Sequence, residues 1–184
     1  NLETGKLNPF EALYLAETTQ DIIAQDRNPA PDWARNVSYT YLGSEDISKN
    51  RYTEAGFAEL EFAKMWPRTW QMVCREENIP EAGDYYVYDI GPNSFVVVRT
   101  EQGDIKAHYN SCMHRGTKLK PSGTEGSSRD LRCPFHGWTW NLDGSLRSIP
   151  EKWDFPHVDE TKMCLPQARV ERLAGFVWVN MDPA

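Results

Sequence analysis

The sequence predicts a mainly β protein whose strands are preceded by helices near the amino-terminal end of the chain. From Trp70 onward, short runs rich in β-branched and aromatic residues alternate with turn residues, which is typical of consecutive strands. Before Trp70, two longer segments carry helix-start and helix-stop signals instead. The 184 residues are enough for about one main domain with a hydrophobic core of its own.

The first expected helix covers residues 9–25. Asn8 supplies a capping side chain, Pro9 suits the first helical position, and Glu11 places an acid in the first turn. The following segment, residues 27–33, contains two prolines that prevent the helix from continuing. We therefore expect an extended arm after the helix.

A second helix is expected to begin at Thr53 and to stop near Trp66. It stops there because a residue that precedes proline, here Pro67, is disfavoured in the helical region. The apolar residues of this segment are interpreted as core. They are Phe57, Leu60, Phe62, Ala63 and Trp66.

Eight runs are predicted to be strands because they combine β-branched and aromatic residues between turn signals. They cover residues 70–73, 85–90, 95–100, 105–110, 131–135, 138–142, 168–173 and 176–181. Glycine-containing turns at residues 101–104 and 142–145 favour hairpins, since glycine tolerates a positive φ. The polar, Gly/Ser-rich residues 120–130 are interpreted as a mobile loop.

Composition and charge exclude several classes of protein. Hydrophobic residues make up 40% and charged residues 26% of the chain, which is the range of a folded globular protein. With 20 basic and 27 acidic residues the net charge is −7, which disfavours a nucleic-acid partner. No apolar run approaches the roughly 18 residues that a membrane-spanning helix needs. The first residues also lack a secretory signal, so a cytoplasmic location is expected.

Four cysteines are too few for a disulfide scaffold, and two of them lie beside histidines. Cys112 and His114 are two positions apart, Cys133 and His136 are three apart, and 18 residues separate these halves. Residues i and i+2 of a strand share a face, so the first half can direct both side chains at one ion. Thiolates and imidazoles together suit either zinc or iron–sulfur chemistry.

The order of the four residues discriminates between these metals. A zinc finger usually presents a cysteine pair and then a histidine pair on a helix, whereas each half here mixes both residue types. The pattern C-x-H-R-G followed by C-P-F-H-G-W resembles the signature of the Rieske family. The resemblance implies an antiparallel β-sandwich with a small cluster-binding subdomain, about residues 108–150. It also implies a 2Fe–2S cluster with Cys112 and Cys133 on one iron and His114 and His136 on the other.

Residues around these four positions refine the resemblance. Gly116 and Gly137 are expected to let backbone N–H groups approach the cluster sulfurs. Thr117 and Phe135 stand where respiratory Rieske proteins carry two further cysteines, and Trp138 stands where they carry a serine that donates to a sulfide. Fewer hydrogen-bond donors to the cluster predict a reduction potential toward the negative end of the Rieske range of roughly −150 to +300 mV. That favours an oxygenase or a ferredoxin.

The flanking sequence favours the oxygenase. Residues 51–91 resemble the entry to the α subunit of Rieske non-haem iron oxygenases of the aromatic-ring-hydroxylating type, and residues 175–183 resemble the end of their Rieske domain. This implies a helical extension or arm over residues 1–49 and a Rieske domain over residues 50–184. In that family a further domain holds a mononuclear Fe(II) through two histidines and a carboxylate.

The function implied by the resemblance is electron transfer. Electrons from NAD(P)H would arrive through a reductase, with or without a ferredoxin, and pass to the catalytic domain of the same or a neighbouring α subunit in a homo-oligomer. Asp154 and His157 leave a triad incomplete, so we interpret them as a surface turn, and His108 as a strand residue. Two alternatives stay open, a stand-alone Rieske electron carrier and a structural zinc module.

The segment between the two halves is basic. Residues 115–132 contain two acids and five bases, a local charge of +3 within a chain of −7. Either this is an ordinary solvated loop or it steers an acidic reductase or ferredoxin toward the cluster. The bases are Arg115, Lys118, Lys120, Arg129 and Arg132. The remaining cysteines, Cys74 and Cys164, are expected to be buried or free thiols.

Overall fold

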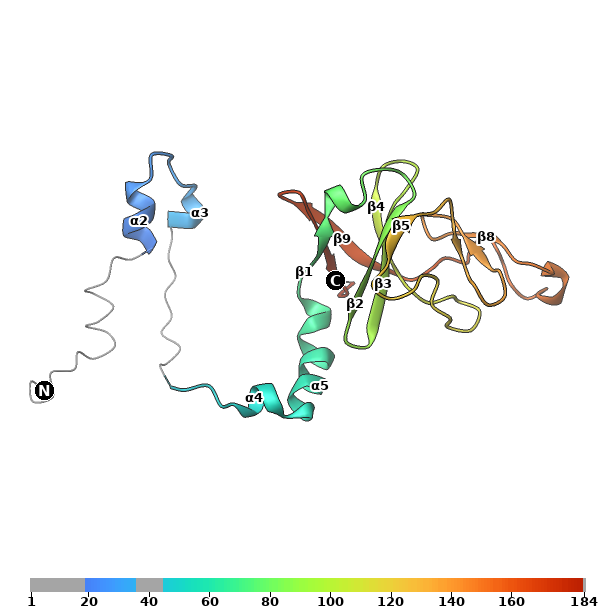
Figure 1. The fold of residues 1–184 in the computed structure, drawn as a ribbon, viewed down its shortest axis with the longest axis horizontal. Coiled ribbons are helices and arrows are strands. Elements are labelled where there is room, and N and C mark those ends of the chain that lie inside the picture. The colour runs from blue at the N-terminus through green and yellow to red at the C-terminus, as the bar shows by residue number, and fades with distance from the viewer. Residues whose placement is uncertain (1–18, 36–44, 184) are drawn as a thin grey trace, which may run out of the picture. The chain divides into compact units, whose positions relative to one another are not determined.

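The computed structural model describes residues 19–35 and 45–183 (Figure 1). The chain divides into two compact units, Asn1–Arg51 and Tyr52–Ala184. In the first unit, helix α2 (Thr19–Gln25) ends at the predicted residue, and the predicted start of that helix lies outside the described residues. The expected arm contains a short helix, α3 (Asp32–Arg35). Helix α4 (Asn50–Thr53) follows at the boundary of the units.

The second unit begins with helix α5 (Ala55–Lys64), which confirms the second predicted helix to within two residues at each end. A short 3-10 helix, η1 (Trp66–Arg68), carries the chain through Pro67. The expected core role of this helix is wrong. No residue of α5 is buried, and Leu60 is 48% exposed. Within α5 only Phe57, Glu61 and Phe62 are half-buried, so the helix contacts the rest of the unit along one edge.

One of those contacts depends on a glycine. The ring of Phe62 occupies the place of a side chain at Gly91, 2.3 Å from where a Cβ would lie. Gly91 also has a positive φ of 51° at the turn between two strands. A residue with a side chain is disfavoured there by both its backbone conformation and its neighbour.

Ten strands build the remainder of the second unit, and every pair that the structure describes is antiparallel. The large sheet has the order β1-β10-β9-β4-β3-β2-β5. Its strands are β1 (Gln71–Arg75), β2 (Asp84–Ile90), β3 (Asn93–Arg99), β4 (Ile105–Tyr109), β5 (Glu125–Ser127), β9 (Gln167–Leu173) and β10 (Phe176–Asn180). The mainly antiparallel β class is therefore confirmed.

The small sheet has the order β6-β7-β8 and forms its own lobe, at the right of Figure 1. Its strands are β6 (Leu131–Arg132), β7 (Thr139–Trp140) and β8 (Leu146–Ser148). The predicted hairpin turns are confirmed: residues 101–104 join β3 to β4, and residues 142–145 join β7 to β8. Two further 3-10 helices are η2 (Glu76–Asn78) and η3 (Lys152–Asp154).

The prediction of a mobile loop over residues 120–130 is wrong, because this segment contains edge strand β5. The strand pairs with β2, with Glu125 opposite Tyr86. Gly126 lies over the ring of Tyr85, whose hydroxyl oxygen is 3.4 Å from where a Cβ would be. All three residues of β5 are exposed, so the segment lacks the apolar alternation by which strands are recognised.

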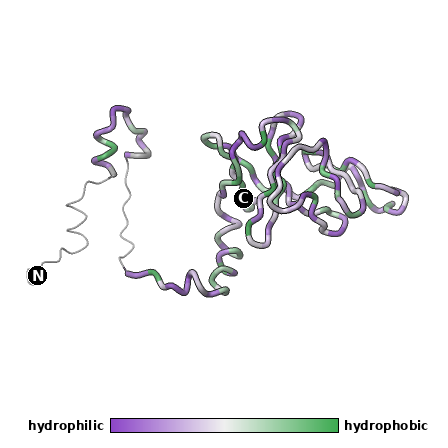
Figure 2. Tube along the Cα trace, in the orientation of Figure 1, coloured by the Kyte–Doolittle hydropathy of each residue, from purple (hydrophilic) through white to green (hydrophobic). Residues whose placement is uncertain are grey.

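Strand β3 separates two hydrophobic cores. Val96 and Val98 belong to the core that reaches the small sheet, whereas Phe95 and Val97 belong to the core of the large sheet. Alternate residues of a strand point to opposite faces, so β3 is buried on both sides. Hydrophobic and hydrophilic positions interleave along the strands in Figure 2, as this alternation requires. None of the described helices has both the length and the apolar character to cross a lipid bilayer.

Candidate metal centre

The first of two cysteine loops covers residues 112–117, directly after β4. The N–H of Cys112 donates to the carbonyl oxygen of Thr117 at 2.9 Å, and the N–H of Gly116 donates back to the carbonyl oxygen of Cys112 at 2.8 Å. Gly116 has a φ of 75°, a conformation that closes the turn and favours glycine. The loop is thus a tight, internally hydrogen-bonded turn that begins at its cysteine.

The second loop, residues 133–138, repeats this pattern between β6 and β7. The N–H of Cys133 donates to the carbonyl oxygen of Trp138 at 2.8 Å, and that of Gly137 donates to the carbonyl oxygen of Cys133 at 3.1 Å. Gly137 has a φ of 72°. The two cysteines therefore occupy equivalent positions in two turns of the same kind.

The two glycines have a defined role in these turns. Their own N–H groups donate to the cysteine carbonyl oxygens, and the expectation that the glycines let backbone N–H groups approach the cluster sulfurs stays a prediction. Both positions require the left-handed backbone conformation, which is unfavourable for residues that have a Cβ.

The two thiols lie together inside the core. Cys112 is 2% exposed and Cys133 is 3% exposed, and both are free cysteines within the same hydrophobic cluster. Burial raises the pKa of the Cys112 thiol, and the neighbouring Cys133 thiol adds to the rise. Both thiols therefore lie in an apolar environment.

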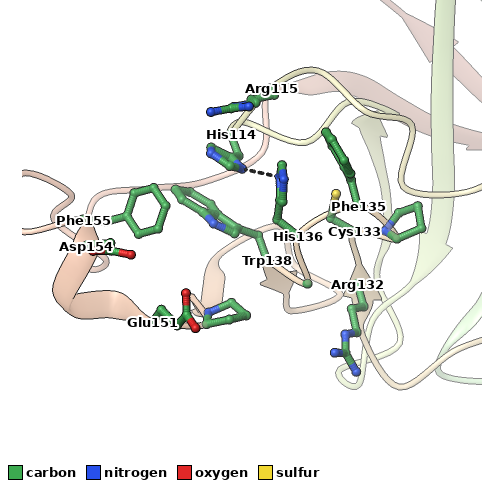
Figure 3. Close-up of a pocket in the computed structure, with 13 residues that line it drawn as sticks. His114, Arg115, Arg132, Cys133, Phe135, His136, Trp138, Glu151, Asp154 and Phe155 are labelled. Carbon is green, nitrogen blue, oxygen red and sulfur yellow. Dashed lines mark hydrogen bonds between the residues drawn. The ribbon is translucent and has the colours of Figure 1, made fainter.

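The two imidazoles lie together at the surface, as Figure 3 shows. The Nδ1 atoms of His114 and His136 face each other at 3.2 Å, and the ring centroids are 4.8 Å apart. Each Nε2 is therefore on the far side of its ring. His136 is exposed and His114 is half-buried. Burial lowers the pKa of His114, with His136 and Arg115 adding to the decrease.

Aromatic side chains hold the two imidazoles. Trp138 stacks on His114, with centroids 4.8 Å apart and planes within 3°. Phe155 meets both rings edge-on, at 5.5 Å from His114 and 5.2 Å from Trp138. His136 contacts the ring of Phe135 at 3.8 Å, and Phe135 is 61% exposed. The orientation of His114 is thus set from two sides, whereas His136 is covered only by an exposed ring.

A cleft of about 770 Å³ opens over the imidazoles. Arginines of the two loop regions, Arg115 and Arg132, line it together with the acids Glu151 and Asp154 (Figure 3). Glu151 has a φ of 53°, an uncommon conformation for a residue with a side chain. The rim of the cleft therefore carries charges of both signs.

The donor set fits a 2Fe–2S cluster of the Rieske kind. That cluster takes two thiolates on one iron and two imidazoles on the other, and the side chains here are already sorted into a thiol pair and an imidazole pair. Within residues 19–35 and 45–183, no group of three or more His, Cys, Asp or Glu side chains is arranged to hold a single ion.

Comparison with known proteins supports this fit. Residues 69–159 match the family described as the Rieske 2Fe–2S domain. The chain contains a Rieske domain. The cofactor of a Rieske domain is a 2Fe–2S cluster, so the alternative of a structural zinc module is abandoned.

Relatives of this Rieske domain are oxygenase subunits. The chain is 33% identical over 133 residues to the biphenyl 2,3-dioxygenase subunit alpha of Rhodococcus jostii, covering 71% of this chain and 28% of that protein. It is 34% identical over 158 residues to the carnitine monooxygenase oxygenase subunit of Escherichia coli, covering 85% of this chain and 42% of the relative. The chain thus spans less than half the length of these relatives.

The fold is shared with solved oxygenase structures. Naphthalene 1,2-dioxygenase from Rhodococcus sp. superposes with a TM-score of 0.64 and 31% sequence identity, over 69% of this chain and 29% of that one. The resemblance to oxygenase α subunits that the sequence motifs implied is therefore confirmed, together with the Rieske-type fold.

The other residues considered in the sequence lie in different environments. His108 is fully buried, its Nε2 donates to the carbonyl oxygen of Leu142 at 2.9 Å, and burial lowers its pKa. Cys74 is buried, which raises the pKa of its thiol to about 11, and Cys164 is an exposed free thiol. His157 lines a second cleft, of about 390 Å³, beside His114.

Sequence reasoning missed three contributors to the site. Phe155 follows η3 and reaches His114 from a segment interpreted only as a surface turn. Glu151 lines the cleft in its left-handed conformation. Trp140 was assigned to a strand without a role in the site. It lies two positions after Trp138, and the shared face of i and i+2 strand residues is the signal that could have identified it.

Proposed function

We propose that Cys112 and Cys133 hold one iron of the cluster, that His114 and His136 hold the other, and that the domain relays electrons. The observation that carries this proposal is the sorting of the ligands by burial, with the thiols in the core and the imidazoles at a cleft. A bound 2Fe–2S cluster supplies one-electron oxidation and reduction.

The residues of the chain have separate tasks in this relay. The buried thiols and the apolar side chains around them exclude water from one side of the site. The imidazoles present their Nε2 edges to the cleft, where an N–H can donate to an acceptor on another protein surface. Trp138 and Phe155 fix the ring plane of His114, so this edge keeps one direction.

The electron donor in this proposal is a ferredoxin or an NAD(P)H-dependent reductase, and the acceptor is a mononuclear iron site outside this chain. The similarity to dioxygenase and monooxygenase subunits supports an oxygenase over a stand-alone carrier. The acceptor belongs to the same or a neighbouring α subunit in a homo-oligomer. The substrate of the oxygenase is selected by the part of the protein that holds that iron.

The iron content tests this proposal. The purified chain should contain about two irons and two acid-labile sulfides, and the reduced protein should give a Rieske-type electron paramagnetic resonance signal. One zinc per chain without sulfide would refute the ligand assignment. The native polypeptide should contain about one further iron, bound by two histidines and a carboxylate. A native polypeptide with two irons only would identify a stand-alone carrier.

A turnover experiment separates the relay from the oxygenation step. Supplied with a reductant and oxygen, this chain alone should be reduced and reoxidised without hydroxylating biphenyl or carnitine, the compounds named for its relatives. Product formed by the purified chain would overturn the assignment of the catalytic iron to another part of the protein.

The structure refines which bases can steer a redox partner. Lys118 is paired with Asp89 at 3.2 Å and donates to Ser122, so its charge is partly compensated. Lys120 is half-buried over the ring of Tyr85. These two lysines of the basic segment are therefore poor candidates for a docking surface.

Arg115 and Arg132 are better candidates. Both are exposed and line the cleft beside the imidazoles. An acidic partner attracted to them would approach the histidine edge, with an on-rate that falls as salt rises. Stopped-flow reduction should slow several-fold in Arg115→Glu and Arg132→Glu and change little in Arg68→Glu, which makes the same charge change on η1. Equal rates in all three variants would exclude the arginines as the docking surface.

A further inference from the structure

Trp140 on β7 carries a buried polar group without a partner. The side chain is fully buried, yet its indole N–H has no hydrogen-bond partner among the residues that the structure describes. A buried tryptophan N–H usually finds an acceptor, because leaving it unpaired in an apolar environment is unfavourable. The buried indole N–H therefore needs an acceptor, and the described residues alone do not supply one.

A candidate acceptor is the sulfur of Cys112, which lies in the same buried cluster. Trp140, Cys112 and Cys133 belong to the same core cluster. Among the described side chains of this cluster, Trp140 is the one with a buried polar atom that lacks a partner, and its side chain is one of the groups that interact with the Cys112 thiol. A neutral thiol is a weak acceptor, whereas a metal-bound thiolate accepts a charge-assisted hydrogen bond.

The strand explains why this residue can serve the thiol side of the site. Trp138 directly precedes β7 and Trp140 ends it, and their ring centroids are 6.3 Å apart. Trp138 stacks on His114, at the imidazole side. Trp138, the residue before β7, therefore contacts the imidazole side of the site. Trp140, on β7 itself, lies on the thiol side.

We infer that Trp140 is a positioning residue whose indole N–H donates a hydrogen bond to the Cys112 sulfur when that sulfur binds iron, and that it raises the reduction potential. A donor to a ligand sulfur stabilises the reduced cluster, which is the more negative state. This inference rests on the proposed ligand assignment. It also modifies the expectation, drawn from Trp138, that the site has few donors.

The test is the reduction potential of Trp140→Phe in the full chain. Phenylalanine keeps an aromatic ring in the core and removes only the N–H and part of the ring volume. The equilibrium constant for reduction should fall roughly tenfold, which for one electron is about 59 mV toward more negative potential. Trp178→Phe is the matched control, because Trp178 on β10 also has a buried indole N–H without a partner but belongs to the large sheet. Its potential should equal that of the parent.

A second measurement keeps the test decisive if Trp140→Phe fails to fold. In the parent protein labelled with indole-15N tryptophan, pulsed electron paramagnetic resonance of the reduced cluster should detect a coupling to one indole nitrogen. The coupling should persist in Trp178→Phe. A parent protein without the coupling, or a Trp140→Phe protein with a full cluster and an unchanged potential, would overturn the inference. A parent chain that binds no cluster would overturn the proposed function instead.

Discussion

The inner and outer sides of the metal centre use the same backbone turns in opposite environments. The inner side, Cys112, Cys133 and Trp140, is at most 3% exposed. The outer side, His114, His136 and Phe135, lies at the cleft, with Phe135 61% exposed. A single turn therefore starts inside the core and reaches the surface within a few residues. In the proposed function, retention of the cluster is the task of the inner side, and contact with redox partners is the task of the outer side.

The two turns also differ from each other on the outer side. In the first, the histidine follows its cysteine by two positions, stacks on Trp138 and meets Phe155 edge-on. In the second, it follows by three positions and is exposed. Since the backbone hydrogen bonds are equivalent, the extra residue changes where the imidazole lies without changing where the thiol lies.

The largest effect is expected at the inner side, from Cys112→Ser. A serine hydroxyl is a poor substitute for a soft thiolate ligand, so the cluster should be lost. The measurement is iron and acid-labile sulfide per chain. Cys164→Ser, at an exposed free cysteine, is the control and should keep both. Loss of the cluster in the control, or retention in Cys112→Ser, would show that the ligand assignment is wrong.

The next effect distinguishes the two turns. Gly137→Ala places a Cβ 3.2 Å from Cγ of Pro150 and 3.4 Å from a guanidinium nitrogen of Arg132, whereas Gly116→Ala meets only the hydroxyl of Ser111 at 3.7 Å. Both substitutions force alanine into a left-handed conformation, at about 1–2 kcal/mol. We expect a loss of about 1 kcal/mol for Gly116→Ala and about 2 kcal/mol for Gly137→Ala, measured by urea unfolding. Equal losses would mean that the second turn relaxes around its new side chain.

A smaller effect contrasts the buried His108 with the histidines of the outer side. Burial lowers the pKa of His108 in the folded protein, so below about pH 6.5 the unfolded state binds a proton that the folded state does not. The free energy of unfolding should therefore fall with decreasing pH, by up to about 1.4 kcal/mol per pH unit. Urea unfolding from pH 7 to 5 measures the slope, and His108→Gln should reduce it. An unchanged slope in this variant would assign the pH dependence to other groups.

The sequence was most informative where chemistry is encoded by neighbouring residues. The four cysteine and histidine positions could be singled out by their spacing, their family could be recognised from the resemblance of C-x-H-R-G and C-P-F-H-G-W to its signature, and β-branched runs predicted the strands of the large core. Strand β5 could not be found in this way, because Glu125–Ser127 pairs through its backbone and buries no side chain. The apolar residues of α5 were misjudged because periodicity does not state what a helix packs against.

Tertiary contacts explain the remaining omissions at the site. Trp140 has an unpaired N–H only because of what surrounds it in the folded core. Phe155 reaches His114 from a segment 41 positions further along the chain. The ion pair by which Asp89 partly compensates the charge of Lys118 likewise depends on β2 lying beside the loop. None of these relations is local, so no pattern in a short window of sequence reports them.

The smallest effect is expected at the outer side, from Phe135→Ser. Phe135 contacts His136 but is 61% exposed, so removing its ring forfeits little buried apolar area, and the free energy of unfolding should change by less than about 0.5 kcal/mol. The iron content should stay at the parent level, because the thiols remain buried. The matched inner-side variant is Leu131→Ala, at a fully buried residue of the cysteine core, which should cost about 2–5 kcal/mol. If Phe135→Ser instead destabilises the protein as much as Leu131→Ala does, the outer side is part of the hydrophobic core. That result would refute the assignment of different tasks to the two sides of the centre.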